Sequence, residues 1–242
     1  MIPSVHASDA QTRIQTISYQ LESDRHGSVL IPACSAMDPP DEVSAQAEAD
    51  ADRESNEYHV RLMLRVKDGD IAAFEEIVEI HQHAVIGTVA KMLGNASDAE
   101  DIAQQVFIRV WKSAARYQVS AKFTTWMFTI TRNLVFNEMR RRKRKPVVSM
   151  DEREEEYNLI AKDESTATPD QQVLENELVK AIDDAIQSLP EKQRLAVILR
   201  RYEDRSYEEI AEILSMSLSA VKSLLFRARG QLKENLQVYL TE

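Results

Sequence analysis

Near the C-terminus, apolar residues recur at helical spacing in two segments separated by a short polar stretch. In residues 206–214 the apolar positions are Ile210, Ala211 and Leu214, and Ser206 stands three residues before Glu209, as in a capping box. Residues 218–232 carry a second apolar stripe, made of Val221, Leu224, Leu225, Ala228 and Leu232. The pattern predicts two helices joined by a turn at residues 215–217.

The second of these helices carries polar and basic residues on its other side. These residues are Ser219, Lys222, Ser223 and Arg227. A short helix, a tight turn and a longer helix with such a face are typical of a helix-turn-helix, whose second helix enters the DNA major groove. The alternative is an ordinary αα-hairpin in a helical bundle. Small residues and cations favour DNA, because the helix must approach base edges without steric bulk.

Upstream, helical periodicity predicts helices over residues 57–69, over residues 70–93 and from Ser97 onward. Gly69 and Gly94 are the expected stops, Asp70 the expected cap of the second helix, and Ser97 with Glu100 a second capping box. The third helix has a polar face near its start, formed by Asp98, Asp101, Gln104 and Gln105. On physical grounds alone this face is an ordinary solvated surface.

Residues 121–145 combine aromatic and basic side chains in one predicted helix. The residues concerned are Lys122, Phe123, Thr124, Trp126, Phe128, Arg132, Asn133, Phe136 and Asn137. Six consecutive cations follow, from Arg140 and Arg141 to Lys145. Aromatic rings beside cations suit unpaired bases, and the cations suit phosphates. The alternative is a solvated helix end that is favourable to the helix dipole.

Composition indicates an all-α protein without catalytic or metal chemistry. The 242 residues include only 5 Gly, 7 Pro and 1 Cys. No apolar run is long enough for a membrane span, and no secretion signal is apparent, so we expect a cytoplasmic protein without membrane insertion. The histidines are scattered, and phosphate-loop and nucleophile motifs are absent. We therefore expect no cofactor, no metal, no catalytic residue and no enzymatic activity.

Charge and composition divide the chain into four parts. Residues 1–56 form an expected disordered acidic N-terminal extension, residues 57–145 a first helical domain, residues 146–171 a flexible acidic linker and residues 172–242 a second helical domain. The net charge is −10, but residues 58–149 carry 15 cations against 9 acids. The first folded part is therefore basic, which fits a nucleic-acid partner better than the total suggests.

This organisation resembles the sigma-70 superfamily of bacterial RNA polymerase sigma factors, in its small extracytoplasmic-function (ECF) form with sigma domains 2 and 4. The strings that carry the resemblance include DAEDIAQQVFIRVW, KFTTWMFTITRNLVFNEMRRRKR, LPEKQRLAVILRRYEDRSYEEIAEIL and SAVKSLLFRAR. It implies a factor that binds core RNA polymerase, at the clamp helices of the largest subunit and at the flap. It also implies promoter DNA as a partner, control by an anti-sigma factor, and a monomer within the holoenzyme.

The resemblance also implies roles for particular residues. Core polymerase binding would fall to Asp98, Asp101, Gln104 and Gln105. Recognition and melting of the minus-ten element would fall to Lys122, Phe123, Thr124, Trp126, Arg132, Asn133, Asn137, Arg140 and Arg141. Recognition of the minus-thirty-five element would fall to Ser219, Lys222, Ser223 and Arg227. Family members often carry Arg where Leu224 stands and His where Phe226 stands, so the promoter sequence cannot be borrowed from relatives.

Two other classes remain open from the sequence. The chain could be a conventional helix-turn-helix regulator, in which the polymerase-binding face would have no role. It could also be a sigma mimic that titrates an anti-sigma factor, which would not need the basic run at residues 140–145. The binding of core polymerase separates the first of these from a sigma factor.

Overall fold

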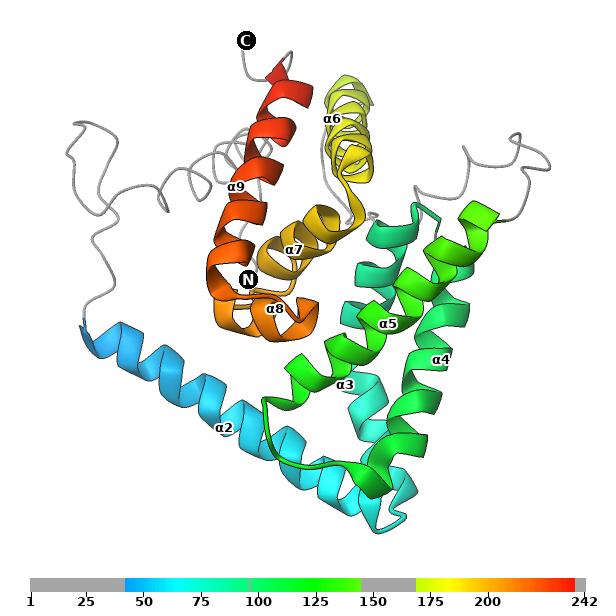
Figure 1. Cartoon of the computed structure of the whole chain (residues 1–242), viewed down its shortest axis with the longest axis vertical. Helices are drawn as coiled ribbons and strands as arrows, with labels where there is room; N and C mark the ends of the chain where they lie inside the picture. Colours follow the sequence, from blue (N-terminus) through cyan, green and yellow to red (C-terminus); the bar gives the residue numbers. More distant parts are fainter. Residues whose placement is uncertain (1–41, 96, 145–168, 238–242) are drawn as a thin grey trace.

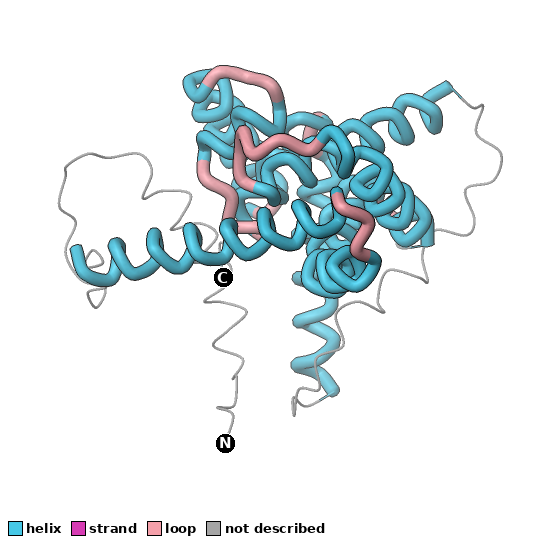
Figure 2. Tube along the Cα trace, turned by 90° about the horizontal axis from the view of Figure 1, so that it is seen from below, coloured by secondary structure: helices cyan, strands magenta, loops and turns pink. Residues whose placement is uncertain are grey.

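The computed structural model describes residues 42–95, 97–144 and 169–237, all within helices and their connections (Figure 1). The elements are α2 Glu42–Lys67, α3 Ile71–Leu93, α4 Ser97–Ser113, the 3-10 turn η1 Ala114–Arg116, α5 Phe123–Arg144, α6 Pro169–Ser188, α7 Glu191–Arg201, α8 Tyr207–Leu214 and α9 Leu218–Asn235. No strand occurs in these ranges (Figure 2). The predicted all-α fold is confirmed. None of these helices is long and apolar enough to cross a membrane.

Helices α2 to α5 form the first half, and its helix ends agree largely with the sequence. The Asp70 side chain accepts a 3.1 Å hydrogen bond from the Ala73 N–H and caps α3. Gly94 ends α3 in the left-handed region at φ 68°, which glycine adopts without steric cost. Helix α4 begins at Ser97, as predicted, and near this start the Asp98 N–H donates to Oδ1 of Asn95 at 3.4 Å.

The first helix begins much earlier than predicted. α2 starts at Glu42, so residues 42–56 are helical, and the expected helix start at residue 57 is wrong. Residues 1–41 and the linker from residue 145 to 168 lie outside the described residues. Helix α6 begins at Pro169, three residues before the expected boundary of the second domain.

Helices α6 to α9 form the second half, which contains the predicted helix-turn-helix. Ser206 and Glu209 make a complete capping box at the start of α8, with both reciprocal hydrogen bonds present. Ser215 turns the chain in the left-handed region at φ 53°, and the Ser217 side chain caps α9. The predicted stripe of α9 is buried in full. Local sequence signals therefore specify this motif.

The two halves pack against each other along α5. Helix α8 lies against α5, and α7 lies against α3 (Figure 1). Buried side chains of both halves belong to one hydrophobic cluster, which includes Val85, Phe128, Ile198 and Ile213. The arrangement places the helix-turn-helix directly over the aromatic and basic helix, and this contact decides which candidate site residues are accessible.

Candidate nucleic-acid interface

The outer face of α9 is accessible along its first three turns. Ser219, Lys222, Ser223 and Arg227 are all exposed, while the stripe on the opposite side is buried. The Ser223 hydroxyl donates to the Ser219 carbonyl at 3.0 Å and leaves the face free of bulk. Leu224 belongs to the buried stripe and faces the core. The geometry matches that of a recognition helix.

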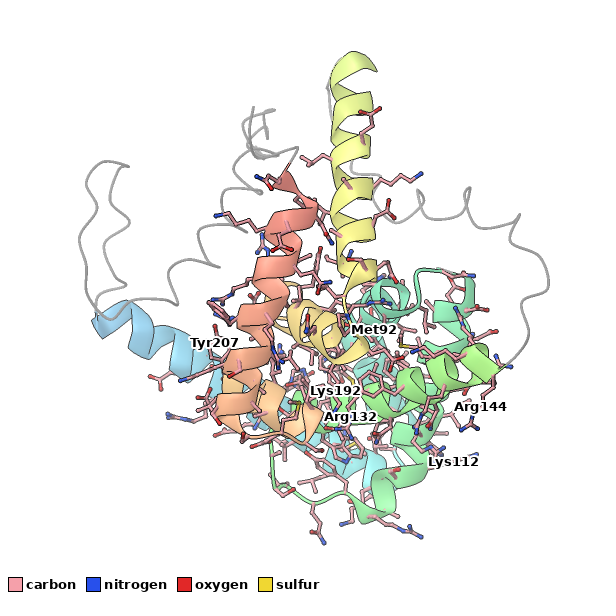
Figure 3. All side chains as sticks on the ribbon, turned by 45° about the horizontal axis from the view of Figure 1, so that its top comes forward. Met92, Lys112, Arg132, Arg144, Lys192 and Tyr207 are labelled. Atoms are coloured by element: carbon pink, nitrogen blue, oxygen red, sulfur yellow. The ribbon has the colours of Figure 1, made fainter. Side chains whose placement is uncertain are left out.

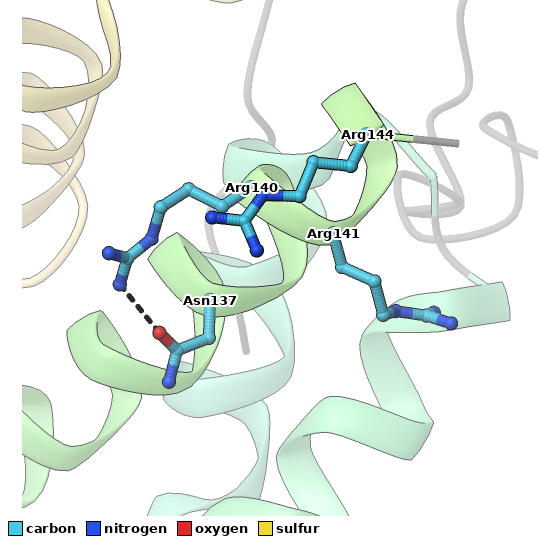
Figure 4. Close-up of a pocket in the computed structure, with 4 residues that line it drawn as sticks. All are labelled: Asn137, Arg140, Arg141 and Arg144. Atoms are coloured by element: carbon cyan, nitrogen blue, oxygen red, sulfur yellow. Dashed lines mark hydrogen bonds between the residues drawn. The ribbon is translucent and has the colours of Figure 1, made fainter. Parts of the chain in front are cut away.

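The basic end of α5 forms a second exposed surface. An open hollow there is lined by Asn137, Arg140, Arg141 and Arg144 (Figure 4). Arg140 donates to Oδ1 of Asn137 at 2.6 Å, which holds the two side chains side by side. Guanidinium groups offer several donors in a fixed plane and bind phosphate well. This hollow therefore suits the backbone of a nucleic acid.

One buried acid organises part of the basic end. Glu138 receives two hydrogen bonds from Arg141, at 2.6 and 2.8 Å, and one from Arg142 at 3.0 Å. These arginines hold the pKa of Glu138 below its usual range. Arg142 also pairs with Asp98 of α4, and Lys143 pairs with Glu191 of α7 at 2.6 Å. The five cations from Arg140 to Arg144 are therefore not equivalent: Arg140, Arg141 and Arg144 line the hollow, while Arg142 and Lys143 pair with other helices.

At its other end, α5 begins in a buried aromatic cluster. Phe123 has no exposed surface, and its ring lies 5.4 to 6.4 Å from the rings of His59, His81, Tyr117 and Trp126. Burial lowers the pKa of His81 to about 4, so this imidazole is neutral at pH 7. In this conformation Phe123 is a core residue and is not on an exposed surface, whereas the sequence predicts a contact with DNA.

Lys122 stands just before α5 and contacts two carboxylates. Its ammonium group pairs with Asp52 of α2 and lies 3.5 Å from Oε1 of Glu209 in α8. Partial burial acts against the charged form, but the two carboxylates outweigh it and raise the pKa of Lys122. A predicted DNA-binding cation is thus already neutralised within the chain.

Helix α8 and the connection before it contact further residues of the predicted strand-binding face. Arg205 donates to the Thr124 hydroxyl at 2.7 Å, and the Thr125 hydroxyl donates to Glu209 at 3.4 Å. Arg132 points into the contact between the halves (Figure 3), where it donates to the Ile213 carbonyl and, at 3.0 Å, to the Ser215 hydroxyl. Asn133 stays exposed beside Arg132, and Trp126 is half-buried. Most of the face is therefore unavailable to DNA in this arrangement.

The polar face of α4 is open. Asp98, Asp101, Gln104 and Gln105 are exposed, and the face continues with two exposed apolar side chains, Ile108 and Trp111. Trp111 packs edge-on against Phe74 of α3 at 5.0 Å, which fixes its ring on the surface. Trp111 was not among the predicted site residues. Trp111 lies seven residues after Gln104, about two helical turns, and this spacing indicates that both residues lie on one face of α4.

A partly buried carboxylate links the two halves beside the covered face. Oε1 of Glu203, in the α7–α8 connection, accepts a 2.9 Å hydrogen bond from the Thr88 hydroxyl of α3. Burial raises the pKa of Glu203 to about 7, with Asp204 adding to the effect and Thr88 and Arg205 opposing it. The contact between the halves therefore favours a neutral carboxyl at this position.

Replacing Glu203 with glutamine is expected to stabilise the protein at pH 8. The pKa of Glu203 is higher in the folded state than in the unfolded state. Its carboxyl therefore stabilises the folded state at low pH, and this stabilisation is lost as the pH rises to about 7. The side chain is only partly buried, so we discount the full linkage value and expect a gain of about 1–3 kcal/mol at pH 8. Urea unfolding should show this gain shrinking towards pH 5. An equal effect at both values would contradict the assignment.

Both halves match family models for sigma factors. The model described as Sigma-70 region 2 matches residues 77–145, and the model described as Sigma-70, region 4 matches residues 180–232. The first range holds α5 with most of α3 and α4, and the second holds the helix-turn-helix. The fold and its exposed surfaces thus define a helical DNA-binding protein with two characteristic regions in a fixed order.

Curated relatives extend this similarity over most of the chain. The ECF RNA polymerase sigma factor SigW of Bacillus subtilis is 35% identical over 179 residues, which cover 72% of this chain and 94% of SigW. The RNA polymerase sigma-H factor of Pseudomonas aeruginosa is 31% identical over 191 residues, which cover 78% and 98%. The chain belongs to the sigma-70 family, in the ECF group of RNA polymerase sigma factors. This membership supports the expectation of a non-enzymatic initiation factor.

Solved structures share the fold. The sigma factor RpoE of Bartonella quintana, solved with the anti-sigma factor NepR, has a TM-score of 0.54 at 24% identity and aligns over 69% of this chain and 99% of its own. CnrH, solved with the cytosolic domain of CnrY, has a TM-score of 0.55 at 18% identity and aligns over 75% and 98%. At these identities the similarity concerns the fold alone.

Proposed function

We propose that this sigma factor binds core RNA polymerase in the cytoplasm, as a monomer within the holoenzyme, and directs it to a subset of promoters. Asp98, Asp101, Gln104 and Gln105 would contact the polymerase clamp helices, with Ile108 and Trp111 extending that surface. The second half would contact the polymerase flap. The observation that carries the proposal is the exposed face of α9. Its four polar residues lie on the side of the helix opposite the apolar stripe, which is fully buried.

Reading of the minus-ten element requires a different arrangement of the halves. Lys122, Thr124, Trp126, Arg132 and Asn133 would meet the unwound strand, yet α8 and the connection before it contact Lys122, Thr124 and Arg132. Asn137, Arg140 and Arg141 would hold phosphates from the exposed hollow. The 24 residues between Arg144 and Pro169 reach up to ~80 Å when extended, which permits the halves to separate. Polymerase and promoter DNA would favour the separated form by binding it more tightly.

We infer that an anti-sigma factor controls this chain. Two structures with the same fold, RpoE of Bartonella quintana and CnrH, were solved with NepR and with the cytosolic domain of CnrY. A partner that binds both halves in their packed arrangement would keep α8 on α5 and delay the separation. Such a partner needs no contact with Lys122, Thr124 or Arg132, because the second half of the chain already contacts them.

Replacing both Lys222 and Arg227 with alanine should weaken binding to duplex DNA, most strongly at low salt. Each phosphate contact contributes about −0.9 to the slope of log K against log salt, so loss of two contacts should lower the slope by up to about 1.8. Fluorescence anisotropy with a labelled duplex measures both effects. Lys233 lies on the same helix about three turns from Lys222, and Lys233→Ala serves as control. An unchanged slope would contradict a role for this face in DNA binding.

The binding of core polymerase tests the proposed function most simply. Equimolar full-length protein and core RNA polymerase are mixed and separated by gel filtration. We expect a stoichiometric complex. A protein that elutes alone, while it still binds duplex DNA, would instead support the conventional regulator.

A further inference from the structure

The helical extension at the start of α2 reaches the DNA-reading end of α5. α2 is 26 residues long, about 39 Å, and its N-terminal part carries several acidic residues. Its C-terminal part packs on α3 and α5. The extension is therefore a helical continuation of the first half, and it places Asp52 beside Lys122.

Two side chains of the extension contact the start of α5. A carboxylate oxygen of Asp52 lies 2.5 Å from Nζ of Lys122, and Oδ1 of Asn56 accepts a 2.9 Å hydrogen bond from the Phe123 N–H. Residues four apart on a helix lie on the same face, so one face of α2 makes both contacts. Asn56 thus supplies the cap that α5 lacks locally, and Asp52 neutralises the adjacent cation.

The two carboxylates on Lys122 belong to different halves. Glu209 is in α8, so it leaves Lys122 when the halves separate. Asp52 is in α2, which packs within the first half, so it stays on Lys122 in the separated form. A DNA phosphate that approaches Lys122 would still meet a negative charge at hydrogen-bonding distance from the ammonium group.

We propose that the extension of α2 is an intramolecular competitor of single-stranded DNA, with Asp52 in the place of a phosphate on Lys122. This inference rests on the proposed function, since it concerns the same strand-binding face. Asn56 is a positioning residue, because it acts through the backbone of Phe123. The extension therefore restrains strand binding independently of the cover that α8 provides.

The test is a change of Asp52 to asparagine, which removes the charge and keeps the shape. The Asp52 and Lys122 side chains are 53% and 37% exposed, so the pair is well solvated and its effect is modest. We expect the full-length D52N protein to bind a labelled single-stranded oligonucleotide about two- to fivefold more tightly at low salt. The gain should fade as salt increases. Glu54→Gln, an equal charge loss at an exposed position of the same helix, should leave the affinity unchanged.

The same comparison in a Glu209→Gln background removes the competing charge from α8. The amide still offers an oxygen to the Ser206 N–H, so the capping box keeps an acceptor. We expect the gain from D52N to persist there. Two results would contradict the proposal that the extension competes with single-stranded DNA. One is equal affinity of the wild-type, D52N and E54Q proteins in both backgrounds, and the other is a loss of affinity in D52N. This assay needs no polymerase, so a failure of the complex with core polymerase would remain a separate result.

Discussion

Replacing Phe123 with alanine is expected to lower the free energy of unfolding by about 3–5 kcal/mol, the usual cost of a fully buried Phe. The ring has no exposed surface and is surrounded by four other aromatic rings. The cavity would lie where α2, α3 and α5 meet, so these helices cannot easily collapse onto it. Urea unfolding of the free protein, followed by circular dichroism, measures the change.

The matched control for this change is Phe226→Ala. Phe226 lies on α9 with 52% of its surface exposed, so its removal should cost far less than removal of Phe123. A Phe123→Ala protein as stable as Phe226→Ala would show that the Phe123 ring is not part of the core. In that case its expected role as a DNA contact would stand as first predicted.

Replacing Asp101 with arginine should weaken the complex with core polymerase by about 30-fold or more, the effect of a residue at the centre of an interface. Asp101 is exposed on α4, about one helical turn from Gln104 and Gln105. The protein should therefore unfold at the same urea concentration as wild type. Titration of labelled protein with core polymerase gives the affinity.

Glu79→Arg is the control for the charge reversal. Glu79 is exposed on α3, opposite the buried residues Ile77 and His81 of that helix, and it lies outside the α4 face. It should leave the affinity for core polymerase within about twofold of wild type, since surface changes away from an interface have small effects. Equal losses in both variants would indicate long-range electrostatics in place of a defined contact.

Local signals explain why the helix-turn-helix could be predicted in detail. The capping box of Ser206 and Glu209 and the stripe from Val221 to Leu232 depend on residues a few positions apart. The contact between the halves depends on pairs such as Arg132 with Ile213 and Thr88 with Glu203, which lie 81 and 115 residues apart. No periodicity within one helix can indicate such pairs.

α5 shows where periodicity was ambiguous. Trp126, Ile130 and Leu134 are half-buried beside the core, while Phe123, Met127 and Val135 are buried. The helix packs on two sides, against α3 and α4 and against α8, so two stripes are covered instead of one. Aromatic rings near cations were therefore attributed to DNA, although Phe123 at least serves the core.

The start of α2, residues 42–56, is helical although its composition predicts disorder. Residues 42–56 contain few large apolar side chains, and this predicted disorder. They are also rich in Ala and Glu, which have high intrinsic helix propensity. Joined to the packed part of α2, the segment continues an existing helix and avoids the cost of nucleation. Composition alone does not reveal this continuity.

Run-off transcription is the most direct test of the central claim, that this chain is a promoter-selecting subunit of RNA polymerase. Purified core polymerase transcribes a library of genomic fragments with and without the full-length protein. We predict new transcripts from a small set of fragments that share two short elements, separated by the distance that domains 2 and 4 span. A core polymerase that starts at the same places with and without the protein, under conditions where the two form a complex, would contradict the account.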